Sequence, residues 1–365
     1  MGVHGKSRRV CMLFGALLFG GLLLCVLLPK DEYSDSERRA LASMPQLSAK
    51  AVASGRFMED FEAYATDAFP FRDSFRALKA LTADGIFLRA DNHGIYETDG
   101  FLSKLEYPMN PASLQRAADR FRMICDTYLT EENRVFLSVI PDKNCFLAKE
   151  SGHPCMDYAQ FEREMARRAD FAQYIRISDL LERDDYYRTD THWRQERITD
   201  VAGRLAEAMG AVLSSDYELR TLEQDFYGVY HGQAALPLAP DSLCYLTGEP
   251  LECCTAYDWQ NERKIPVYDL ARAQGKDPYE LFLSGPLSLV TVENPDAPAD
   301  RRLVIFRDSF ASSLAPLLMS GYAKITLVDI RYIHPGSLGR LVDFEGCDVL
   351  FLYSTLVLNH SETVK

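Results

Sequence analysis

Three side chains in this sequence are of the types that together perform acyl transfer, namely Ser309, His192 and Asp190. A serine hydroxyl becomes a good nucleophile when a neighbouring base takes its proton, and a histidine is such a base when a carboxylate orients its ring. Asp190 and His192 are separated by one residue, so in an extended segment their side chains leave on the same side. This spacing predicts a serine nucleophile, a histidine base and an aspartate that orients the base.

Ser309 follows the apolar stretch VIF and precedes the helix-forming stretch ASSLAPLL. A serine between a buried strand and a helix exposes its hydroxyl beside the free backbone amides of the first helical turn. Such amides stabilise the oxyanion of a tetrahedral intermediate. The alternatives are that Ser309 only caps the helix, a common role for serine there, and that Asp190 and His192 lie in a surface turn. The presence of both motifs in one chain favours the catalytic interpretation.

The elements that must position these residues alternate between short apolar strands and helices. Continuous apolar strands separated by helices are typical of a parallel sheet that is covered on both faces. Residues 213–292 have weaker periodicity and many turns, and we expect them to form an insertion at one rim of the sheet. The sequence therefore predicts an α/β fold. The expected strands are residues 134–140, 174–178, 301–306, 324–330 and 348–353, and the expected helices are residues 112–130, 311–321 and 338–344.

Two further patterns precede this alternation. Aromatic residues and leucines recur every three to four positions on both sides of Pro70, which predicts two amphipathic helices with a break at the proline. The stretch HGIYETDGFLSK alternates between apolar and polar residues and contains Asp99 followed by Gly100, which predicts a β-hairpin.

The N-terminal region contains an uncharged apolar run, residues 10–28, that follows Lys6, Arg8 and Arg9. The run is long enough to span a bilayer as a helix. The basic residues before it predict a cytoplasmic N-terminus and a body outside the cell membrane. A cleavable signal peptide is an alternative, but it has a shorter apolar core and a cleavage site of small residues. A lipoprotein signal is another, but a leucine precedes its candidate cysteine. We expect a single-pass signal anchor.

The expected organisation is a cytoplasmic tail and transmembrane anchor in residues 1–30, a juxtamembrane linker in residues 31–55 and an extracytoplasmic domain in residues 56–365. The first 30 residues hold four of the 40 basic residues and no acid, so the remainder carries 36 basic and 53 acidic residues, a formal charge of −17. A body this acidic is not expected to bind nucleic acid or an anionic lipid surface.

Seven of the nine cysteines lie beyond the apolar run, an odd number. Cys145 and Cys155 could close a short loop, and so could Cys244 with Cys253 or Cys254, but spacing alone decides neither pair. The sequence has no Cys-x-x-Cys motif, and no two histidines are two, three or four residues apart. We expect no protein-built metal site, and no cofactor is implied.

Several stretches together resemble the DHHW family of exported bacterial proteins: RTDTHW, RDSFASSLAPLL, ITLVDIRYI, DVLFLYST, ERRALASMPQLS, FEAYATDAFPFRDSF and VIPDKN. That family is similar to the SGNH-like proteins of alginate O-acetylation. The resemblance extends from about residue 37 to about residue 357. It implies an SGNH-hydrolase-like fold in which the Asp-His pair precedes the serine. By matched motif positions it implies Ser309 as nucleophile, His192 as base and Asp190 as the residue that orients the base.

Two positions depart from the family's pattern. Thr191 replaces the first histidine of the motif for which the family is named, at a position without an assigned catalytic role. Arg307 stands where a glycine precedes Asp-Ser in ordinary SGNH esterases, so it offers a backbone amide without the flexibility of glycine.

Four residues are candidates for substrate contact. Arg331 and Lys143 each follow an apolar strand, on the edge where parallel sheets bind ligands, although Arg331 could instead form a structural ion pair. Trp193 could stack on a sugar ring or pack behind His192. Arg307 is the fourth, because it adjoins the Asp-Ser motif.

With this resemblance, the sequence predicts a membrane-anchored serine acyltransferase that O-acetylates a cell-envelope or secreted polysaccharide. The resemblance also implies a partner, a multi-pass membrane acyltransferase that supplies the acetyl group. Two alternatives stay open. One is a carbohydrate acetyl esterase with the same three residues, and the other is a non-catalytic scaffold or binding protein of a glycan-modification system.

Overall fold

The computed structural model describes residues 3–34, 36–87 and 89–365. Met1 and Gly2 of the expected cytoplasmic tail, Asp35 of the expected linker and Leu88 lie outside the described residues.

The chain forms two compact units. The first unit comprises Met1–Asn92 and His231–Pro237, and the second unit comprises His93–Tyr230 and Leu238–Lys365. Asp190, His192 and Ser309 all belong to the second unit, so the geometry of the candidate site depends on that unit alone.

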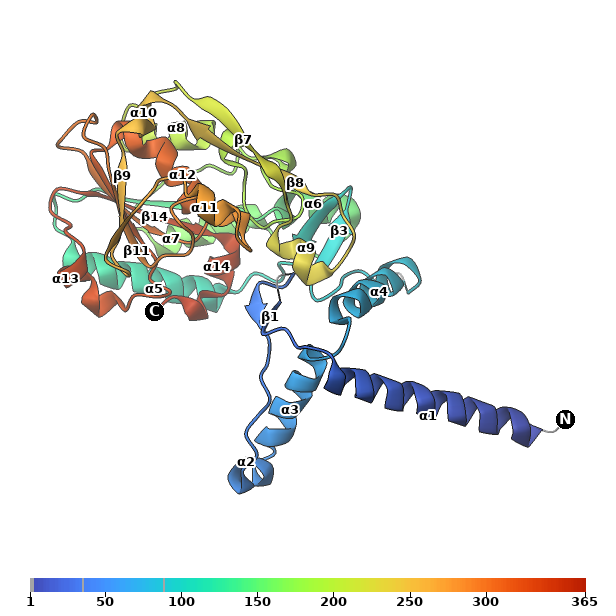
Figure 1. Ribbon diagram of the computed structural model, residues 1–365. Helices are drawn as coiled ribbons and strands as arrows, with labels where there is room; N and C mark the ends of the chain where they lie inside the picture. The colour runs from blue at the N-terminus through green and yellow to red at the C-terminus, as the bar shows by residue number, and fades with distance from the viewer. Residues whose placement is uncertain (1–2, 35, 88) are drawn as a thin grey trace. The chain divides into compact units, whose positions relative to one another are not determined.

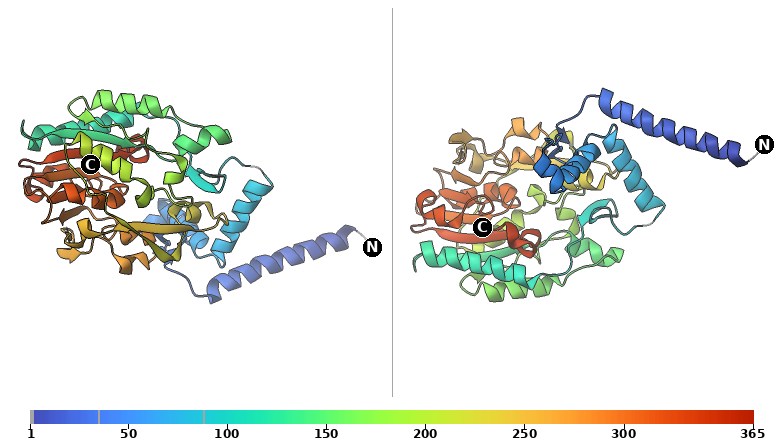
Figure 2. Two further views of the ribbon diagram at one scale, coloured as in Figure 1. Left: turned by 90° about the horizontal axis from the view of Figure 1, so that it is seen from above. Right: turned by 90° about the horizontal axis from the view of Figure 1, so that it is seen from below.

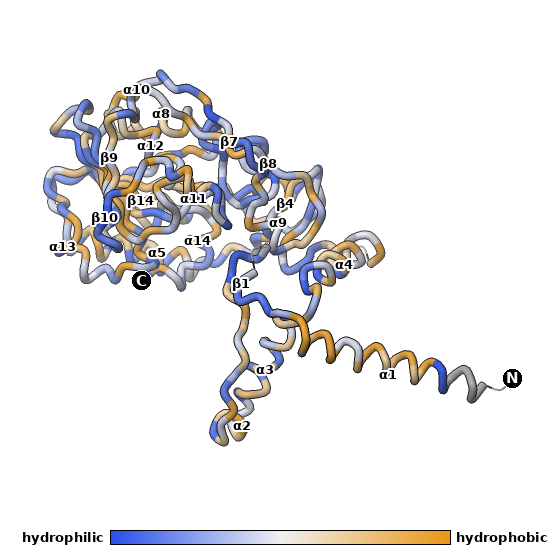
Figure 3. Tube along the Cα trace, viewed as in Figure 1, coloured by the Kyte–Doolittle hydropathy of each residue, from blue (hydrophilic) through white to orange (hydrophobic). Residues whose placement is uncertain are grey.

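The first unit begins with helix α1, Val3–Leu27. Its segment Arg8–Cys25 has a mean hydropathy of 1.7, and Figure 3 shows apolar residues along most of the helix. At about 1.5 Å per residue these 18 residues extend about 27 Å, so α1 is long and apolar enough to cross a membrane.

The remaining elements of the first unit include the two helices expected around Pro70. Helix α3 ends at Asp67 and α4 begins at Arg72, and between them Phe71 has a left-handed backbone with φ of 56°. The chain cannot continue a helix through the proline, and the prediction of a break is confirmed. The elements are β1 Tyr33–Ser34, β2 Arg39–Ala40, α2 Ala49–Ala53, α3 Arg56–Asp67 and α4 Arg72–Gly85.

The second unit is built on an eight-stranded sheet with the order β10-β9-β11-β13-β12-β14-β5-β6. The five strands from β13 to β6 are parallel, which confirms the expected parallel core. These strands are apolar along their length because helices cover both faces of the sheet, as Figures 1 and 2 show. Their bounds are β5 Val135–Ile140, β6 Gln173–Tyr174, β12 Arg302–Arg307, β13 Lys324–Val328 and β14 Asp348–Ser354.

Alternate side chains of β12 enter opposite halves of the core. Ile305 packs in a cluster with residues of α8 and α12, whereas Phe306 packs in a cluster with residues of α5 and α7. Helix α5 shows how the sequence specifies this packing: Leu114, Ala117 and Phe121 recur on one face and are fully buried. The main covering helices are α5 Pro111–Tyr128, α7 Tyr158–Arg168, α8 Thr199–Ala208 and α12 Ala311–Leu318.

Residues 213–292 differ from the expectation in one respect, because they extend the sheet. Three antiparallel strands, β9, β10 and β11, continue it beyond β13. Strands of three to five residues carry little periodicity of their own, and pairing with β13 gives them their register. The α/β fold class is confirmed, with this antiparallel extension added. The elements here are β7 Glu218–Phe226, α9 Val229–Ala234, β8 Asp241–Thr247, α10 Glu249–Glu252, β9 Thr255–Asp258, β10 Arg263–Ile265, α11 Leu270–Ala273 and β11 Leu289–Glu293.

The expected hairpin is present as β3, Ile95–Thr98, and β4, Phe101–Lys104. Asp99 and Gly100 connect the strands with φ of 50° and 78°. Two consecutive left-handed residues are what a tight hairpin turn requires, and an Asp-Gly pair adopts them readily.

All nine cysteines are free thiols, so none of the short-loop disulfides considered from the sequence is formed. Burial raises the pKa of Cys145 and of Cys254 to about 12. Both thiols are therefore protonated at neutral pH and are poor nucleophiles.

Candidate active site

Ser309 lies just beyond the carboxyl end of the parallel strand β12, on the edge where open α/β sheets bind ligands. It occupies the turn between β12 and α12 and is partly exposed. The side chain of Asp308 holds this turn in place. Its carboxylate accepts a hydrogen bond from the amide of Phe310 at 3.1 Å and one from the amide of Ser354, at the end of β14, at 2.8 Å. The serine is thus attached to two neighbouring strands of the sheet.

The first amides of α12 differ from the expectation. The amide of Phe310 donates to the Asp308 side chain, that of Ala311 to the Asp308 carbonyl at 3.3 Å, and that of Ser312 to the Ser309 carbonyl at 3.1 Å. These three amides serve the turn itself, so the prediction that they face an anion is wrong. Ser309 does not cap the helix either, because Phe310 occupies the cap position.

Asp190 and His192 lie on a loop whose ends are paired. Tyr186 and Trp193 form an antiparallel bridge, and the amide of Tyr187 donates to the carbonyl of His192 at 3.1 Å. The segment between them is bent, whereas the sequence predicted an extended one. In this bend Asp190 Oδ1 accepts a hydrogen bond from the amide of His192 at 3.0 Å, a local contact typical of an aspartate in a turn. The turn brings the carboxylate close to the imidazole.

Asp190, His192 and Ser309 form a continuous hydrogen-bonded chain. Nδ1 of His192 lies 2.6 Å from Oδ1 of Asp190, and Nε2 of His192 lies 2.7 Å from Oγ of Ser309. The carboxylate is fully buried, and the side chain of the histidine is 11% exposed. With the proton of the neutral imidazole on Nδ1, Nε2 accepts from the serine hydroxyl. This arrangement can move a proton from Ser309 to His192.

The buried carboxylate has a second support from the segment that follows β7. The amide of Val229 donates to Asp190 Oδ2 at 2.8 Å. This contact needs a close backbone approach at Gly228, where a Cβ atom would lie 2.2 Å from the Cβ of Asp190. Any other residue at this position would clash, so Gly228 is needed for the site. The sequence carried no signal for it, because the two segments are far apart in the chain.

The imidazole lies close to two aromatic rings. The ring of Tyr279 stacks on His192 with a centroid distance of 3.9 Å and an interplanar angle of 7°, and the ring of Phe310 lies at 5.0 Å. The Tyr279 hydroxyl donates to Oγ of Ser313 at 2.9 Å, and burial keeps the pKa of Tyr279 well above its usual value, so it stays a neutral donor. Sequence reasoning missed Tyr279, which lies in the weakly periodic segment 213–292.

Trp193 and Arg307 have internal roles in place of the expected substrate contact. Both are fully buried. The indole N–H of Trp193 donates to the carbonyl of Phe310 and to Oγ of Ser313, both at 3.0 Å, which ties the histidine loop to α12. The guanidinium of Arg307 donates to Oγ of Ser312 and to the carbonyl of Leu287, both at 3.0 Å. The turn after β12 and the segment before β11 are joined through this arginine.

Lys143 also points into the protein: the residue is 1% exposed, and its ammonium donates to three backbone carbonyls of the described chain. Arg331 forms two hydrogen bonds with Asp329, at 2.9 and 2.7 Å, as in the ion-pair alternative considered from the sequence. Its side chain is 21% exposed and lies beyond the end of β13, on the same edge of the sheet as Ser309. Of the four residues expected at the substrate, Arg331 is the one that keeps an exposed surface.

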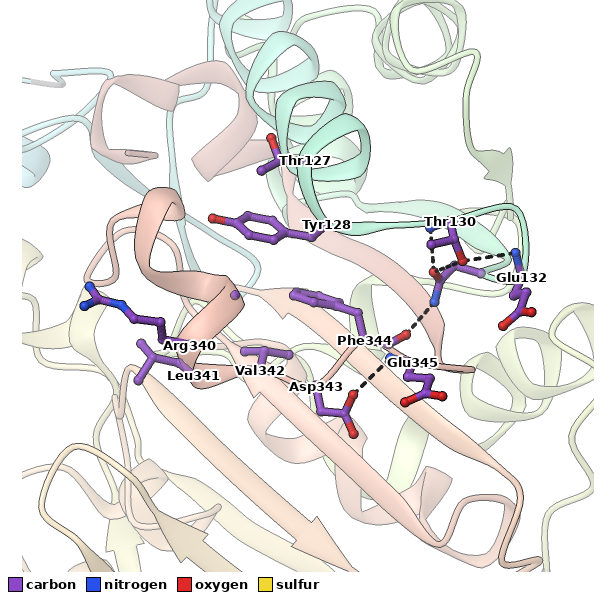
Figure 4. Close-up of a pocket in the computed structure, with 12 residues that line it drawn as sticks. Thr127, Tyr128, Thr130, Glu132, Arg340, Leu341, Val342, Asp343, Phe344 and Glu345 are labelled. Atoms are coloured by element: carbon purple, nitrogen blue, oxygen red, sulfur yellow. Dashed lines mark hydrogen bonds between the residues drawn. The ribbon is translucent and has the colours of Figure 1, made fainter.

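A surface hollow of about 670 Å³ lies away from these residues, and Figure 4 shows its lining. It is formed by the end of α5, including Tyr128, and by the loop before β14, including Phe344. These segments lead into the amino ends of β5 and β14, whereas Ser309 is at the carboxyl end of β12. The hollow holds none of the three candidate catalytic residues.

Comparison with known proteins finds solved structures that resemble this one. No protein-family model matches the sequence, and no curated protein matches it. A DHHW family protein from Eubacterium siraeum aligns with 74% of this chain and 93% of its own, at 20% identity and a TM-score of 0.60. Bacillus cereus PatB1 with a sulfonyl adduct aligns with 72% of this chain and 97% of its own, at 16% identity and a TM-score of 0.56. The O-acetyltransferase domain of Pseudomonas putida AlgJ aligns with 73% of this chain and 92% of its own, at 15% identity and a TM-score of 0.45.

At these identities the likeness is one of fold. It extends over almost the whole of the DHHW family protein. The chain has the α/β fold of a DHHW family protein, as the resemblance of its motifs predicted.

Proposed function

We propose that this protein is a serine O-acyltransferase that acetylates a cell-envelope or secreted polysaccharide outside the cell membrane. The observation that carries the proposal is the unbroken chain from the buried Asp190 carboxylate through His192 to the Ser309 hydroxyl, with contacts of 2.6 and 2.7 Å. Ser309 is the nucleophile, His192 is the general base and then the general acid, and Asp190 orients the imidazole.

The reaction has two balanced halves. In the first, Oγ of Ser309 attacks the acetyl carbonyl while Nε2 of His192 takes the hydroxyl proton, and the imidazolium then gives that proton to the leaving oxygen of the donor. In the second, an acceptor sugar hydroxyl loses its proton to His192 and attacks the acetyl-serine, and the proton returns to Ser309. Asp190 stabilises the imidazolium that forms in each half.

The oxyanion of the tetrahedral intermediate needs a hydrogen-bond donor at the turn after β12. Of the four amides from Ser309 to Ser312, the turn uses those of Phe310, Ala311 and Ser312. The amide of Ser309 itself is therefore the candidate donor. Arg331 is the candidate for contact with the acceptor, because its side chain is partly exposed on the same edge of the sheet.

Helix α1 supports this location, because it is long and apolar enough to act as a signal anchor. In this proposal residues 1–30 are the tail and anchor, residues 31–55 are a linker and residues 56–365 lie outside the membrane. An acetyl donor must then be delivered across the membrane, and a multi-pass membrane acyltransferase is the proposed partner. The sulfonyl adduct of PatB1 supports covalent chemistry in this fold, since sulfonyl groups attach to nucleophiles.

Hydrolysis of acetyl esters is the second candidate. The partial exposure of Ser309 favours it, because water that reaches the acetyl-serine can replace the sugar as acceptor. The two functions share the first half of the reaction and differ only in the acceptor.

Transfer and hydrolysis are separated by following the acetyl group. The purified protein is given an activated acetyl ester with or without oligosaccharides of cell-envelope glycans, and acetylated sugar and free acetate are both measured. We expect acetylated sugar to form at the expense of acetate when a suitable acceptor is added. Acetate release that stays the same when acceptors are added would favour the esterase. The absence of both acetylated sugar and free acetate would favour the scaffold.

Replacement of Tyr279 by leucine is expected to lower kcat for ester turnover by on the order of tenfold or more, because the imidazole loses the flat surface that sets its plane. Tyr279→Phe keeps the stacked ring and removes only the hydrogen bond to Ser313, so it should retain most of the activity. Initial rates at saturating ester check both. Equal losses in the two variants would show that the hydroxyl matters and the stacking does not.

A further inference from the structure

Lys143 makes three contacts with the loop that carries the Asp-His pair. It lies three residues beyond the end of β5, two strands away from β12 in the sheet. Its Nζ donates to the carbonyl of Tyr187 at 2.7 Å, to that of Arg188 at 3.1 Å and to that of Asp190 at 2.6 Å. The lysine side chain thus binds the backbone at Asp190 and at two residues that precede it in the loop.

This geometry needs the charged form of the lysine. An ammonium group has three N–H donors and no acceptor, and here three carbonyl oxygens surround it. A neutral amine has two N–H donors and a lone pair, so one carbonyl would lose its hydrogen bond and face the lone pair. In a buried site, leaving a polar group without its partner costs about 1 to 3 kcal/mol.

The surroundings of Lys143 affect the pKa of its ammonium in opposite directions. Burial lowers the pKa of Lys143 to about 7, while the nearby carboxylates of Asp190, Asp241 and Asp142 act in the opposite direction. The ring of Tyr230 lies 5.1 Å from Nζ and presents a face that favours a cation. Burial raises the pKa of Asp142 to about 6, so its carboxylate is mostly charged at the pH where Lys143 titrates.

We propose that Lys143 is a positioning residue for the reaction of Ser309: its ammonium holds the loop of residues 187–190 so that Asp190 and His192 meet the serine, and loss of the proton releases the loop. The inference rests on the proposed function. It replaces the substrate contact expected of Lys143 from the sequence with a role inside the protein. The lysine acts through the loop and does not touch the reacting atoms.

The direction of the pH effect follows from the lowered pKa. The ammonium is present below about pH 7 and is lost as the pH rises through that value. All three contacts exist on the acid side of the transition, whereas the neutral amine on the alkaline side can keep at most two of them. The loop should therefore lose order, and Ser309 its reactivity, as the pH rises above about 7.

The loop carries its own fluorescent reporter. The sequence has two tryptophans: Trp193, next to the proposed catalytic histidine, and Trp259, which follows β9 and is 47% exposed. In a Trp259→Phe variant the tryptophan emission comes from Trp193 alone. We expect its wavelength or intensity to change between pH 5.5 and 9 with a midpoint near 7. The change should persist when His192→Gln is added and disappear when Lys143→Met is added.

Reactivity supplies the second measurement. The rate of Ser309 labelling by a phosphonate, measured over the same pH range, should fall on the alkaline side in the wild-type protein. Lys143→Met should label on the order of ten- to a hundredfold more slowly below pH 7 and should lack the alkaline fall. Lys149→Met, in the exposed part of the following helix α6, Asn144–Ser151, is the matched control and should behave as the wild type.

The outcomes separate the inference from the proposed function. If Trp193 fluorescence in the Trp259→Phe protein does not change with pH, the proposed role of Lys143 is wrong, and this test does not require Lys143→Met to fold. A fluorescence transition that remains in the Lys143→Met variant would also overturn that role. A different result would be a fluorescence transition that requires Lys143 in a protein whose Ser309 is never labelled. It would support the role of Lys143 in holding the loop and would overturn the serine mechanism.

Discussion

Replacement of Ser309 by alanine is expected to abolish covalent labelling by a serine-directed phosphonate and to remove nearly all turnover of an activated acetyl ester. The hydroxyl that His192 contacts at 2.7 Å is the atom proposed to carry the acetyl group, and alanine has no replacement for it. For a nucleophile that acts with its base as one unit, kcat should fall by on the order of a millionfold. Intact-protein mass after labelling and initial rates with the ester measure the two effects.

Ser215→Ala is the matched control for this variant, because Ser215 is exposed and distant in sequence from the three catalytic candidates. It should label and turn over like the wild type. Undiminished labelling of Ser309→Ala would identify another residue as the nucleophile. Unchanged ester turnover in Ser309→Ala would favour the non-catalytic scaffold.

Replacement of His192 by alanine is expected to lower ester turnover almost as much as Ser309→Ala does. An unassisted serine hydroxyl is a poor nucleophile at neutral pH, and Nε2 of His192 is the proton acceptor in contact with it. The double variant with both alanines should be scarcely slower than either single variant, because residues that share one step do not contribute independently. Initial rates of the wild type, both single variants and the double variant form the complete cycle.

The serine mechanism would be contradicted if the reductions in rate caused by the two single substitutions were independent. If the fold-reductions from Ser309→Ala and His192→Ala multiply in the double variant, the two residues do not share a step. A fourth rate, that of exposed His360→Ala, controls for the loss of any histidine, because His360 lies in the second unit beyond α14, Thr355–Asn359. It should match the wild type.

The order of elements around the site could be predicted because each is specified by its own residues. The strands β12, β13 and β14 are continuous apolar runs, and the hairpin at Asp99 and Gly100 needs only two residues that tolerate left-handed backbone. The break between α3 and α4 follows from one proline. In all these cases the interaction that decides the structure lies within a few positions of the chain, so the sequence shows it.

The roles of the buried side chains could not be predicted in the same way. Trp193 and Arg307 adjoin the candidate catalytic motifs, and Lys143 follows an apolar strand, and these positions suggested substrate contact. Each points inward because a backbone carbonyl from a distant segment is within reach: that of Asp190, Phe310 or Leu287. Which carbonyl a given side chain will contact cannot be predicted from the residues around it in the sequence.

By itself, the sequence determined the α/β class, the strand that ends at the serine and the candidate set of Asp190, His192 and Ser309. Only the tertiary structure decided how these three meet, because their contact spans 117 positions in the chain between His192 and Ser309. It also decided that Gly228 must lack a Cβ atom beside Asp190 and that Tyr279 must stack on His192. The physical reason is that pattern and propensity are local, whereas close packing and the satisfaction of buried hydrogen bonds depend on segments brought together only by the complete fold.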